Sequence, residues 1–240
     1  MKKFSIAVLG LVVFFCAVSA NGEAQQIPIP SIKSSSLTSD EIARGLKDAL
    51  RVGAEKAALS ASSVDGFYKN QEVFIPFPND AIKVKNTLEG IGRKKEVDEF
   101  VKSLNRAAEE AAKSAAPVFV NAIQEMSIQD ALGILKGGNN AATLYLKDKT
   151  TAQLKVKFQP IVAEAIKKVN VARYWKPVIT AYNKASFLSG GGKVNPNIEA
   201  YVTDQAVAGM FVLIAKEELS IRKDPSARVT DIIKSVFAKQ

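Results

Sequence analysis

Apolar residues recur at helical spacing along most of the chain that follows residue 37. The first such run begins at Thr38, whose spacing to Glu41 is typical of a capping box at a helix start. Its apolar positions then return every three or four residues, which gives the segment one buried face. The same pattern predicts further helices from Pro78 to near Gly90 or Gly92, from Lys94 to Met126, and from Ser127 to Gly137. It predicts four more in the second half of the chain: from Thr150 past Val169, in the next segment around Pro177, from Asn195 to near Arg222, and after Ser226.

Only Val73–Phe77 has the composition of a strand, and prolines at 76 and 78 interrupt it. We therefore expect an extended loop or a short edge element there. In the Lys94–Met126 run, the apolar stripe turns to alanine downstream, which favours close helix packing at the centre of a bundle. Pro117 should kink or break that helix because it lacks a backbone N–H. The chain is predicted to be all-α, a compact bundle of about seven to nine helices.

The first twenty residues have the pattern of a signal peptide. Lys2 and Lys3 precede a short apolar run, and small residues end at Ala20, with a second possible cleavage after Ala24. Residues 21–36 are rich in Gln, Pro and Ser and should form an extended leader. Residues 37–240 should form a single helical domain, with two subdomains as the alternative. The predicted signal peptide indicates export. We therefore expect a periplasmic protein, or a secreted one if the source has no outer membrane, with no transmembrane segment after signal removal.

The mature chain contains neither cysteine nor histidine, since the one cysteine, Cys16, lies in the signal. Lipidation at Cys16 is disfavoured by the bulky residues before it. Disulfides, Ser-His-Asp and Cys-His nucleophiles, and zinc or haem sites built on these side chains are excluded. We expect no cofactor and no metal.

Neighbouring carboxylates still allow acid–base chemistry, with Glu109, Glu110, Glu217 and Glu218 as candidates. Adjacent helix positions point about 100° apart, so neither pair converges by itself. Surface ion pairs of Glu109 with Arg106 and Lys113, and of Glu218 with Arg222, are the simpler interpretation. Ser220–Lys223 matches Ser-x-x-Lys without its companion motifs, and Gly190–Lys193 lacks the Ser or Thr of a phosphate loop. We assign no catalytic residue.

Charge is distributed unevenly along the chain. Loss of the signal lowers the formal net charge from +9 to +7. Ten basic and two acidic residues lie between 140 and 197, so this segment carries +8. Aromatic residues are interleaved with its lysines. Such a mixture fits lipid headgroups, anionic glycans or single strands of nucleic acid, of which nucleic acid is the least expected for an exported protein. The alternative is that the aromatic residues belong to the core and the lysines solvate the outer faces of the helices. The candidate ligand-binding residues are Lys167, Lys168, Arg173, Tyr174, Trp175 and Lys176.

Three segments resemble a bacterial family catalogued as domain of unknown function 4197. They are Val64-Asp65-Gly66-Phe67, the run from Leu104 to Thr150 (LNRAAEEAAKSAAPVFVNAIQEMSIQDALGILKGGNNAATLYLKDKT), and KEELSIRKDPSARVTDIIKSVF from Lys216. The resemblance covers about Leu37 to Phe237. It implies an exported helical protein, mainly of Gram-negative bacteria, in a periplasmic setting. The family has no assigned activity, so no catalytic residues carry over.

The leading hypothesis is a non-catalytic exported protein that binds an anionic or amphiphilic envelope component, lipid or glycan, through residues 140–197. One alternative is a hydrolase or lyase that uses carboxylates. The other is a structural or assembly partner of an envelope complex, which would act on another protein through an exposed apolar patch.

Overall fold

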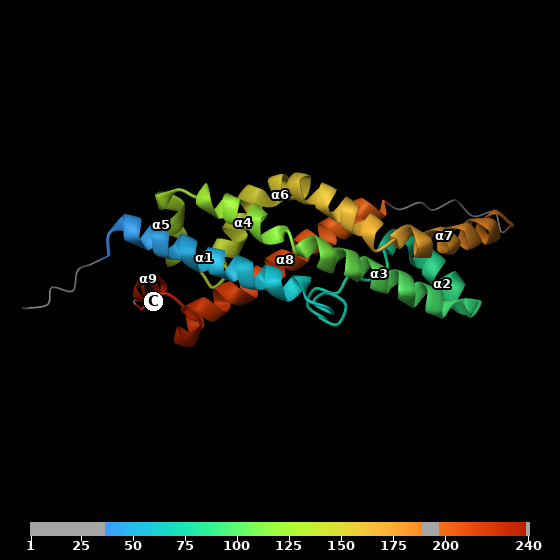
Figure 1. Cartoon of the computed structure of the whole chain (residues 1–240), viewed down its shortest axis with the longest axis horizontal. Coiled ribbons are helices and arrows are strands. Elements are labelled where there is room, and N and C mark those ends of the chain that lie inside the picture. Colours follow the sequence, from blue (N-terminus) through green and yellow to red (C-terminus); the bar gives the residue numbers. More distant parts are fainter. Residues whose placement is uncertain (1–36, 189–196, 239–240) are drawn as a thin grey trace, which may run out of the picture. The chain divides into compact units, whose positions relative to one another are not determined.

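The computed structural model describes residues 37–188 and 197–238, and these fold as nine α-helices and two short 3-10 helices with no β-strand among them (Figure 1). They belong to one compact unit that begins at Leu37. The prediction of an all-α bundle is confirmed. The predicted signal, the leader over 21–36 and the Gly190–Gly192 loop lie outside the described residues. The helices are α1 (Ser39–Ser62), η1 (Asn79–Ala81), α2 (Ile82–Gly90), α3 (Lys94–Ala112), α4 (Ala115–Gln124), α5 (Ile128–Lys136), α6 (Ala141–Lys168), α7 (Val171–Leu188), α8 (Ile198–Lys223), η2 (Pro225–Ala227) and α9 (Asp231–Phe237).

Helix α1 begins as its sequence predicts. The Thr38 hydroxyl accepts the Glu41 backbone N–H at 3.2 Å, and the Glu41 carboxylate accepts the Thr38 N–H at 2.8 Å. These two bonds satisfy backbone groups that a helix start leaves without partners. The apolar face of α1 packs along α8 and also contacts α3, α4, α5 and α9.

Helix α8 packs against both α1 and α6 (Figure 1). By length and composition it is the one helix in the described ranges that qualifies as a candidate membrane span, but half of its most apolar window is buried inside the fold. Val202, Met210 and Ile214 are almost completely buried. The hydrophobicity of α8 is therefore accounted for by core packing.

The Lys94–Met126 run is divided into α3 and α4 at Lys113 and Ser114, ahead of Pro117. Pro117 is the third residue of α4, where no N–H is needed within the helix. The predicted break is confirmed. The alanines of this region, including Ala108, Ala111 and Ala115, are fully buried, as the bundle-centre interpretation predicts.

Helix α6 begins at Ala141, so the prediction of a helix start at Thr150, made from the capping-box spacing of Thr150–Gln153, is wrong. Those residues lie inside α6, where the Thr151 hydroxyl donates to the Lys147 carbonyl of the preceding turn. The helix instead starts after Asn140 and runs through Pro160. Asn170, with φ of 54°, then forms the turn to α7, a conformation that asparagine tolerates better than most residues.

Residues 63–78, here called the 63–78 loop, connect α1 to η1 without a strand, as the Val73–Phe77 prediction allows. The loop nevertheless contributes to the core, because Phe67, Ile75 and Phe77 are buried. Close backbone approaches require glycine at two places. A Cβ on Gly66 would lie 2.3 Å from the Ser60 carbonyl oxygen, and one on Gly209 of α8 would lie 2.9 Å from the Phe67 ring.

Candidate functional site

Helix α3 holds the first part of the 63–78 loop with the carboxylate of Glu109. Its Oε1 accepts the backbone N–H groups of Phe67 and Tyr68, each at 3.1 Å. Its Oε2 receives Arg106 Nη1 at 2.5 Å, and Arg106 Nη2 reaches Asp65 Oδ1 at 2.6 Å. One buried carboxylate therefore fixes two consecutive loop amides, and the arginine joins it to a second acid.

Asp65 sits at the turn where the chain leaves α1, with φ of 69°. Hydrogen bonds from Lys69 and then Arg106 hold the pKa of the Asp65 carboxyl below its ordinary value, because both cations stabilise the ionised form. A general acid needs a raised pKa. Asp65 is thus suited to accepting hydrogen bonds from its two cations and not to donating a proton.

The second part of the loop is held by Asn105, which is completely buried. Its Oδ1 accepts the Ile75 N–H at 2.9 Å, and its Nδ2 donates to the Ile75 carbonyl at 2.8 Å. The side chain satisfies both backbone groups of a residue that has no strand partner. From α8, the Tyr201 hydroxyl donates to the Pro76 carbonyl at 3.0 Å. The loop is irregular in shape but fixed along its length.

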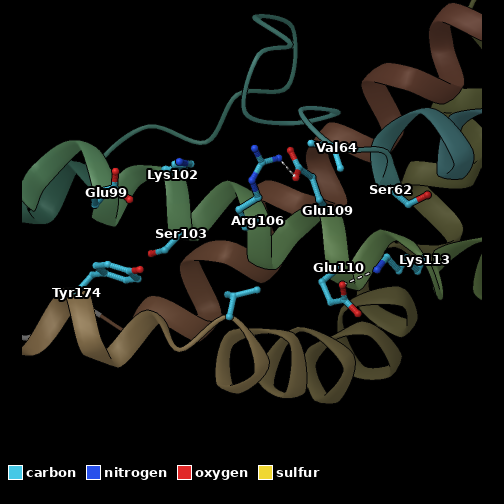
Figure 2. Close-up of a pocket in the computed structure, with 11 residues that line it drawn as sticks. Ser62, Val64, Glu99, Lys102, Ser103, Arg106, Glu109, Glu110, Lys113 and Tyr174 are labelled. Atoms are coloured by element: carbon cyan, nitrogen blue, oxygen red, sulfur yellow. Dashed lines mark hydrogen bonds and ion pairs between the residues drawn. The ribbon is translucent and has the colours of Figure 1, made fainter. Parts of the chain in front are cut away.

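A hollow of about 450 Å³ opens beside the Asp65–Arg106–Glu109 network, between the end of α1, α3 and the α6–α7 turn. Figure 2 shows Arg106 turned toward Glu109, Lys113 toward Glu110, and Tyr174 projecting from α7 toward α3. Ser103, also on the wall, is buried and donates to the Phe100 carbonyl at 2.6 Å. The charged lining residues balance, with Glu99, Glu109 and Glu110 against Lys102, Arg106 and Lys113.

A second buried carboxylate, Glu218 on α8, caps the start of α6. Its oxygens accept the Ala142 N–H at 3.0 Å, the Thr143 N–H at 2.9 Å and the Thr143 hydroxyl at 2.7 Å. Arg222, one turn further along α8, pairs with it at 2.9 Å and donates to the Ile134 carbonyl at the end of α5. Glu218 thereby supplies from 75 residues away the cap that α6 lacks locally.

The structure corrects the expected surface positions of Glu109 and Glu218. The pairs Glu109–Arg106 and Glu218–Arg222 are confirmed, but both glutamates are buried, and Lys113 pairs with Glu110 instead. Glu217 is partly exposed and lies 3.8 Å from Lys56. Glu109 and Glu218 line different cavities, and the cavity at Glu218 is almost filled, with a volume of about 10 Å³.

The predicted binding residues lie at the C-terminal end of α6 and the start of α7. Lys167 and Lys168 are exposed, and they pair with Glu164 and Glu110 respectively. Lys113 and Lys168 together hold the pKa of Glu110 below its ordinary value. Tyr174 is half-buried at the hollow. Trp175 is buried, and its ring stacks on Phe100 with centroids 4.7 Å apart, so it supports α7 from the core side.

Helix α7 presents its cations on one face. Arg173, Lys176 and Lys184 are exposed, whereas Val171, Trp175 and Val178 are buried against the core. The spacings of three and eight residues place all three cations within about 80° of the helix circumference. None of them forms an ion pair with any residue in the described ranges, and α7 contains no Asp or Glu. Lys193, the remaining cation of the basic segment's second half, lies outside the described residues.

The three segments that carry the family resemblance meet one another in the structure. Asp65 and Phe67 bond to Arg106 and Glu109, which belong to the Leu104–Thr150 segment. Glu218 of the C-terminal segment bonds to Ala142 in that same segment. These motif residues supply polar contacts that join the three segments in the fold.

The fold and the site define a helical bundle with two buried Glu–Arg networks, an open polar hollow and a cationic outer helix. The chain belongs to the family described as protein of unknown function (DUF4197), whose profile matches residues 36–238. No curated protein and no solved structure matches the chain.

Proposed function

We propose that this protein is a non-catalytic envelope protein that binds an anionic or amphiphilic component, a lipid headgroup or an acidic glycan. The proposed binding surface consists of the outward face of α7 and the adjoining end of α6. The observation that carries the proposal is the row of Arg173, Lys176 and Lys184, exposed, without acidic neighbours on their helix and without ion pairs to described residues.

Unpaired cations on one face suit an extended anionic partner. The row from Arg173 to Lys184 is about 16 Å long at 1.5 Å per residue, which exceeds the size of a single headgroup. Near an anionic bilayer each Lys or Arg contributes about 1 kcal/mol, and salt weakens the attraction. Several cations on helices α1, α2 and α3 are paired with acids one turn away, as Arg51 is with Glu55 and Lys94 with Asp98. Helix α7 differs in having three cations on one face and no acid of its own.

Other predicted residues have supporting positions in this surface. Lys167 and Lys168 extend it along α6, although each shares its charge with a glutamate. Tyr174 lies between the cationic row and the hollow, where its ring and hydroxyl are available to an amphiphile. Trp175 acts indirectly, because its stack on Phe100 fixes the rotation of α7 that turns the cations outward.

Export and a periplasmic setting remain part of the proposal. The basic start, apolar run and small residues of the first twenty positions support cleavage by a signal peptidase. Mass spectrometry of the protein recovered from a periplasmic extract should give the mass of the chain from Asn21 or from Gln25. Recovery of the uncleaved chain in the cytoplasm would contradict this part of the proposal.

The binding test is co-sedimentation of the mature protein with phosphatidylglycerol vesicles. We expect binding that weakens as salt is raised and that is absent with phosphatidylcholine vesicles. Removing Arg173, Lys176 and Lys184 together by substitution with Ala should weaken binding on the order of 100-fold, at about 1 kcal/mol per cation. The matched control replaces Lys95, Lys136 and Lys223, which are exposed cations on α3, α5 and α8, and removes the same charge.

Equal losses for the two triple variants would show that net charge alone governs binding and would overturn the assignment to α7. A glycan source is separated from a lipid source by a second titration with soluble polygalacturonate. Binding to the polysaccharide with no binding to anionic vesicles identifies a glycan partner, and the reverse identifies lipid. Absence of binding to both overturns the proposal.

The carboxylate and assembly hypotheses gain less support. The buried glutamates lie in separate networks in which backbone amides and arginines occupy their oxygens. Exposed large apolar side chains are found on different helices, such as Leu59 on α1, Ile128 on α5 and Val156 on α6. An assembly role through these residues remains a prediction.

A further inference from the structure

A second hollow, of about 570 Å³, lies on the side of the 63–78 loop that faces α2 and α3. Its apolar wall includes Tyr68, Phe74 and Pro76 from the loop, with Val97 and Val101 from α3. Its charged wall includes Lys69, Lys85, Glu89, Lys94 and Asp98. This hollow shares no lining residue with the one beside Tyr174 and lies outside the cationic face of α7.

The loop that forms this wall is held in place before any ligand arrives. Glu109 fixes the amides of Phe67 and Tyr68, Asn105 fixes both backbone groups of Ile75, and Tyr201 fixes the Pro76 carbonyl. A surface loop so constrained loses little conformational entropy on binding, which is the main advantage of a preorganised site. Rigid positioning of loop side chains is a common arrangement for recognition.

The fixed loop presents two aromatic rings to the hollow. Tyr68 and Phe74 have centroids 6.2 Å apart and planes inclined by 46°. Phe74 is 37% exposed, although its neighbours Val73 and Ile75 are buried. The Arg106 guanidinium lies 5.6 Å from the centre of the Tyr68 ring and adds a cation–π contact. A phenylalanine kept at the surface of a well-fixed loop is available to stack on a flat apolar ligand.

The charges around these rings are already compensated. Lys94 pairs with Asp98 at 2.6 Å, Lys85 with Glu89 at 4.0 Å, and Lys69 with Asp65 at 2.9 Å. A charged ligand would have to compete with one member of each pair, whereas an uncharged ligand with many hydroxyls can bond to donor and acceptor together. The lining therefore favours a ligand with an apolar face and a polar, neutral edge.

A pyranose ring has these properties, since its C–H groups form a flat apolar face and its hydroxyls surround the edge. We propose that the hollow binds an uncharged saccharide, stacked on Phe74 and Tyr68 and hydrogen-bonded to the Lys94–Asp98 pair. This site is independent of the α7 surface and does not require that proposal to be correct.

Saturation-transfer NMR with the mature protein tests the site, with N,N′,N″-triacetylchitotriose, cellotriose and maltotriose as neutral probes and trigalacturonate as the charged one. We expect saturation of the C–H protons of at least one neutral trisaccharide and a weaker signal from trigalacturonate. Trp175 gives a second readout, because it is the only tryptophan and its ring lies 6.1 Å from Phe77, which also lines the hollow.

The decisive variant is Phe74→Ala, for which we expect a loss of affinity of about tenfold or more, as removal of one aromatic stacking surface predicts. Phe74→Tyr keeps the flat ring and should retain binding. Ile128→Ala is the matched control, since Ile128 on α5 is 42% exposed and does not line the hollow. Circular dichroism of each variant checks that the fold is intact.

Three results would overturn the assignment. The first is that no neutral trisaccharide shows saturation at about 10 mM, a concentration that would detect weak millimolar sites. The second is an unchanged affinity in Phe74→Ala. The third is tighter binding of trigalacturonate than of the neutral probes. The triple α7 variant should bind the neutral trisaccharide like the wild type, so failure at one site is distinguished from failure at the other.

Discussion

Glu109 on α3 and Glu218 on α8 occupy corresponding positions in two separate networks. Each glutamate accepts two consecutive backbone N–H groups from a distant segment, and each pairs with an arginine of its own helix, Arg106 or Arg222. Each also has a neighbouring glutamate, Glu110 or Glu217, that stays at the surface side. The same chemical arrangement is therefore used twice to attach a remote backbone segment to a long helix.

The two networks differ in their access to solvent. The Arg106 side chain is 28% exposed beside the open hollow, whereas the Arg222 side chain is 5% exposed, with the Phe237 ring of α9 5.9 Å away. Water therefore reaches the arginine of the first network more readily than that of the second. A buried Glu–Arg pair is costliest to break where its desolvation is complete, because removal of one partner there leaves the other charge buried and uncompensated.

The largest expected effect is that of Glu218→Gln. The substitution leaves the buried Arg222 guanidinium without its carboxylate and weakens the cap of α6, so we expect a loss of about 3–5 kcal/mol in the free energy of unfolding. Urea denaturation followed by circular dichroism measures it. Glu217→Gln, at the adjacent and more exposed position, should change the free energy by less than about 1 kcal/mol. Similar losses for the two variants would show that the burial of Glu218 does not make its pair with Arg222 more costly to break.

Glu109→Gln should have an intermediate effect. The amide oxygen of glutamine can still accept one or both loop N–H groups, and Arg106 keeps Asp65 and solvent as partners. We expect a loss of about 1–3 kcal/mol, the range for a weakened buried hydrogen-bond acceptor. Glu110→Gln is the control, because its partners Lys113 and Lys168 are exposed. A loss in Glu109→Gln as large as that in Glu218→Gln would mean that solvent access does not distinguish the networks.

Most helices could be predicted from the sequence because their signals are local. The capping boxes at Thr38 and Ser127 act over three residues, and the apolar stripes repeat within a few turns. The start of α6 could not be predicted in this way. Its capping group is Glu218, which lies 76 residues beyond Ala142, so no local pattern marks Asn140 as a helix start.

The burial of Glu109 and Asn105 was also beyond sequence patterns. Periodicity identifies the apolar face of α3, but these two polar residues, four positions apart, face the irregular 63–78 loop. A loop supplies unpaired backbone groups, and only polar side chains can satisfy them. The pairing with Arg106 and with Arg222 followed from helical spacing, whereas the depth of each pair depended on tertiary contacts.

In the basic segment, residues 140–197, some features could likewise be predicted from the sequence, and others depended on tertiary contacts. Sequence alone identified the charge excess and the candidate residues, and helix geometry explains why Arg173 and Lys176 share one face of α7. It left open whether Trp175 was exposed, because an aromatic residue among lysines is compatible with either side of the helix. The stack of Trp175 on Phe100 answers that question, and it comes from contacts between α7 and α3.

The smallest expected effect concerns Asp65 and the pH dependence of the open network. Hydrogen bonds from Lys69 and then Arg106 lower the pKa of Asp65 in the folded protein below its ordinary value of 3.8. A lowered folded-state pKa contributes stability above the unfolded-state value, and this stability is lost as pH falls through the folded-state pKa. In Asp65→Asn, the free energy of unfolding should therefore be reduced at pH 7 and should fall less steeply than the wild type below about pH 4.

Lys69→Met should reduce the same slope in part, since Lys69 is the larger cause of the lowered pKa. Urea titrations at several pH values between about 2 and 7 measure both slopes. A curve of unfolding free energy against pH for Asp65→Asn that runs parallel to the wild-type curve would contradict this prediction. It would show that Asp65 contributes no pH-dependent stability, and that solvent weakens the network around Glu109 even more than the partial exposure of Arg106 suggests.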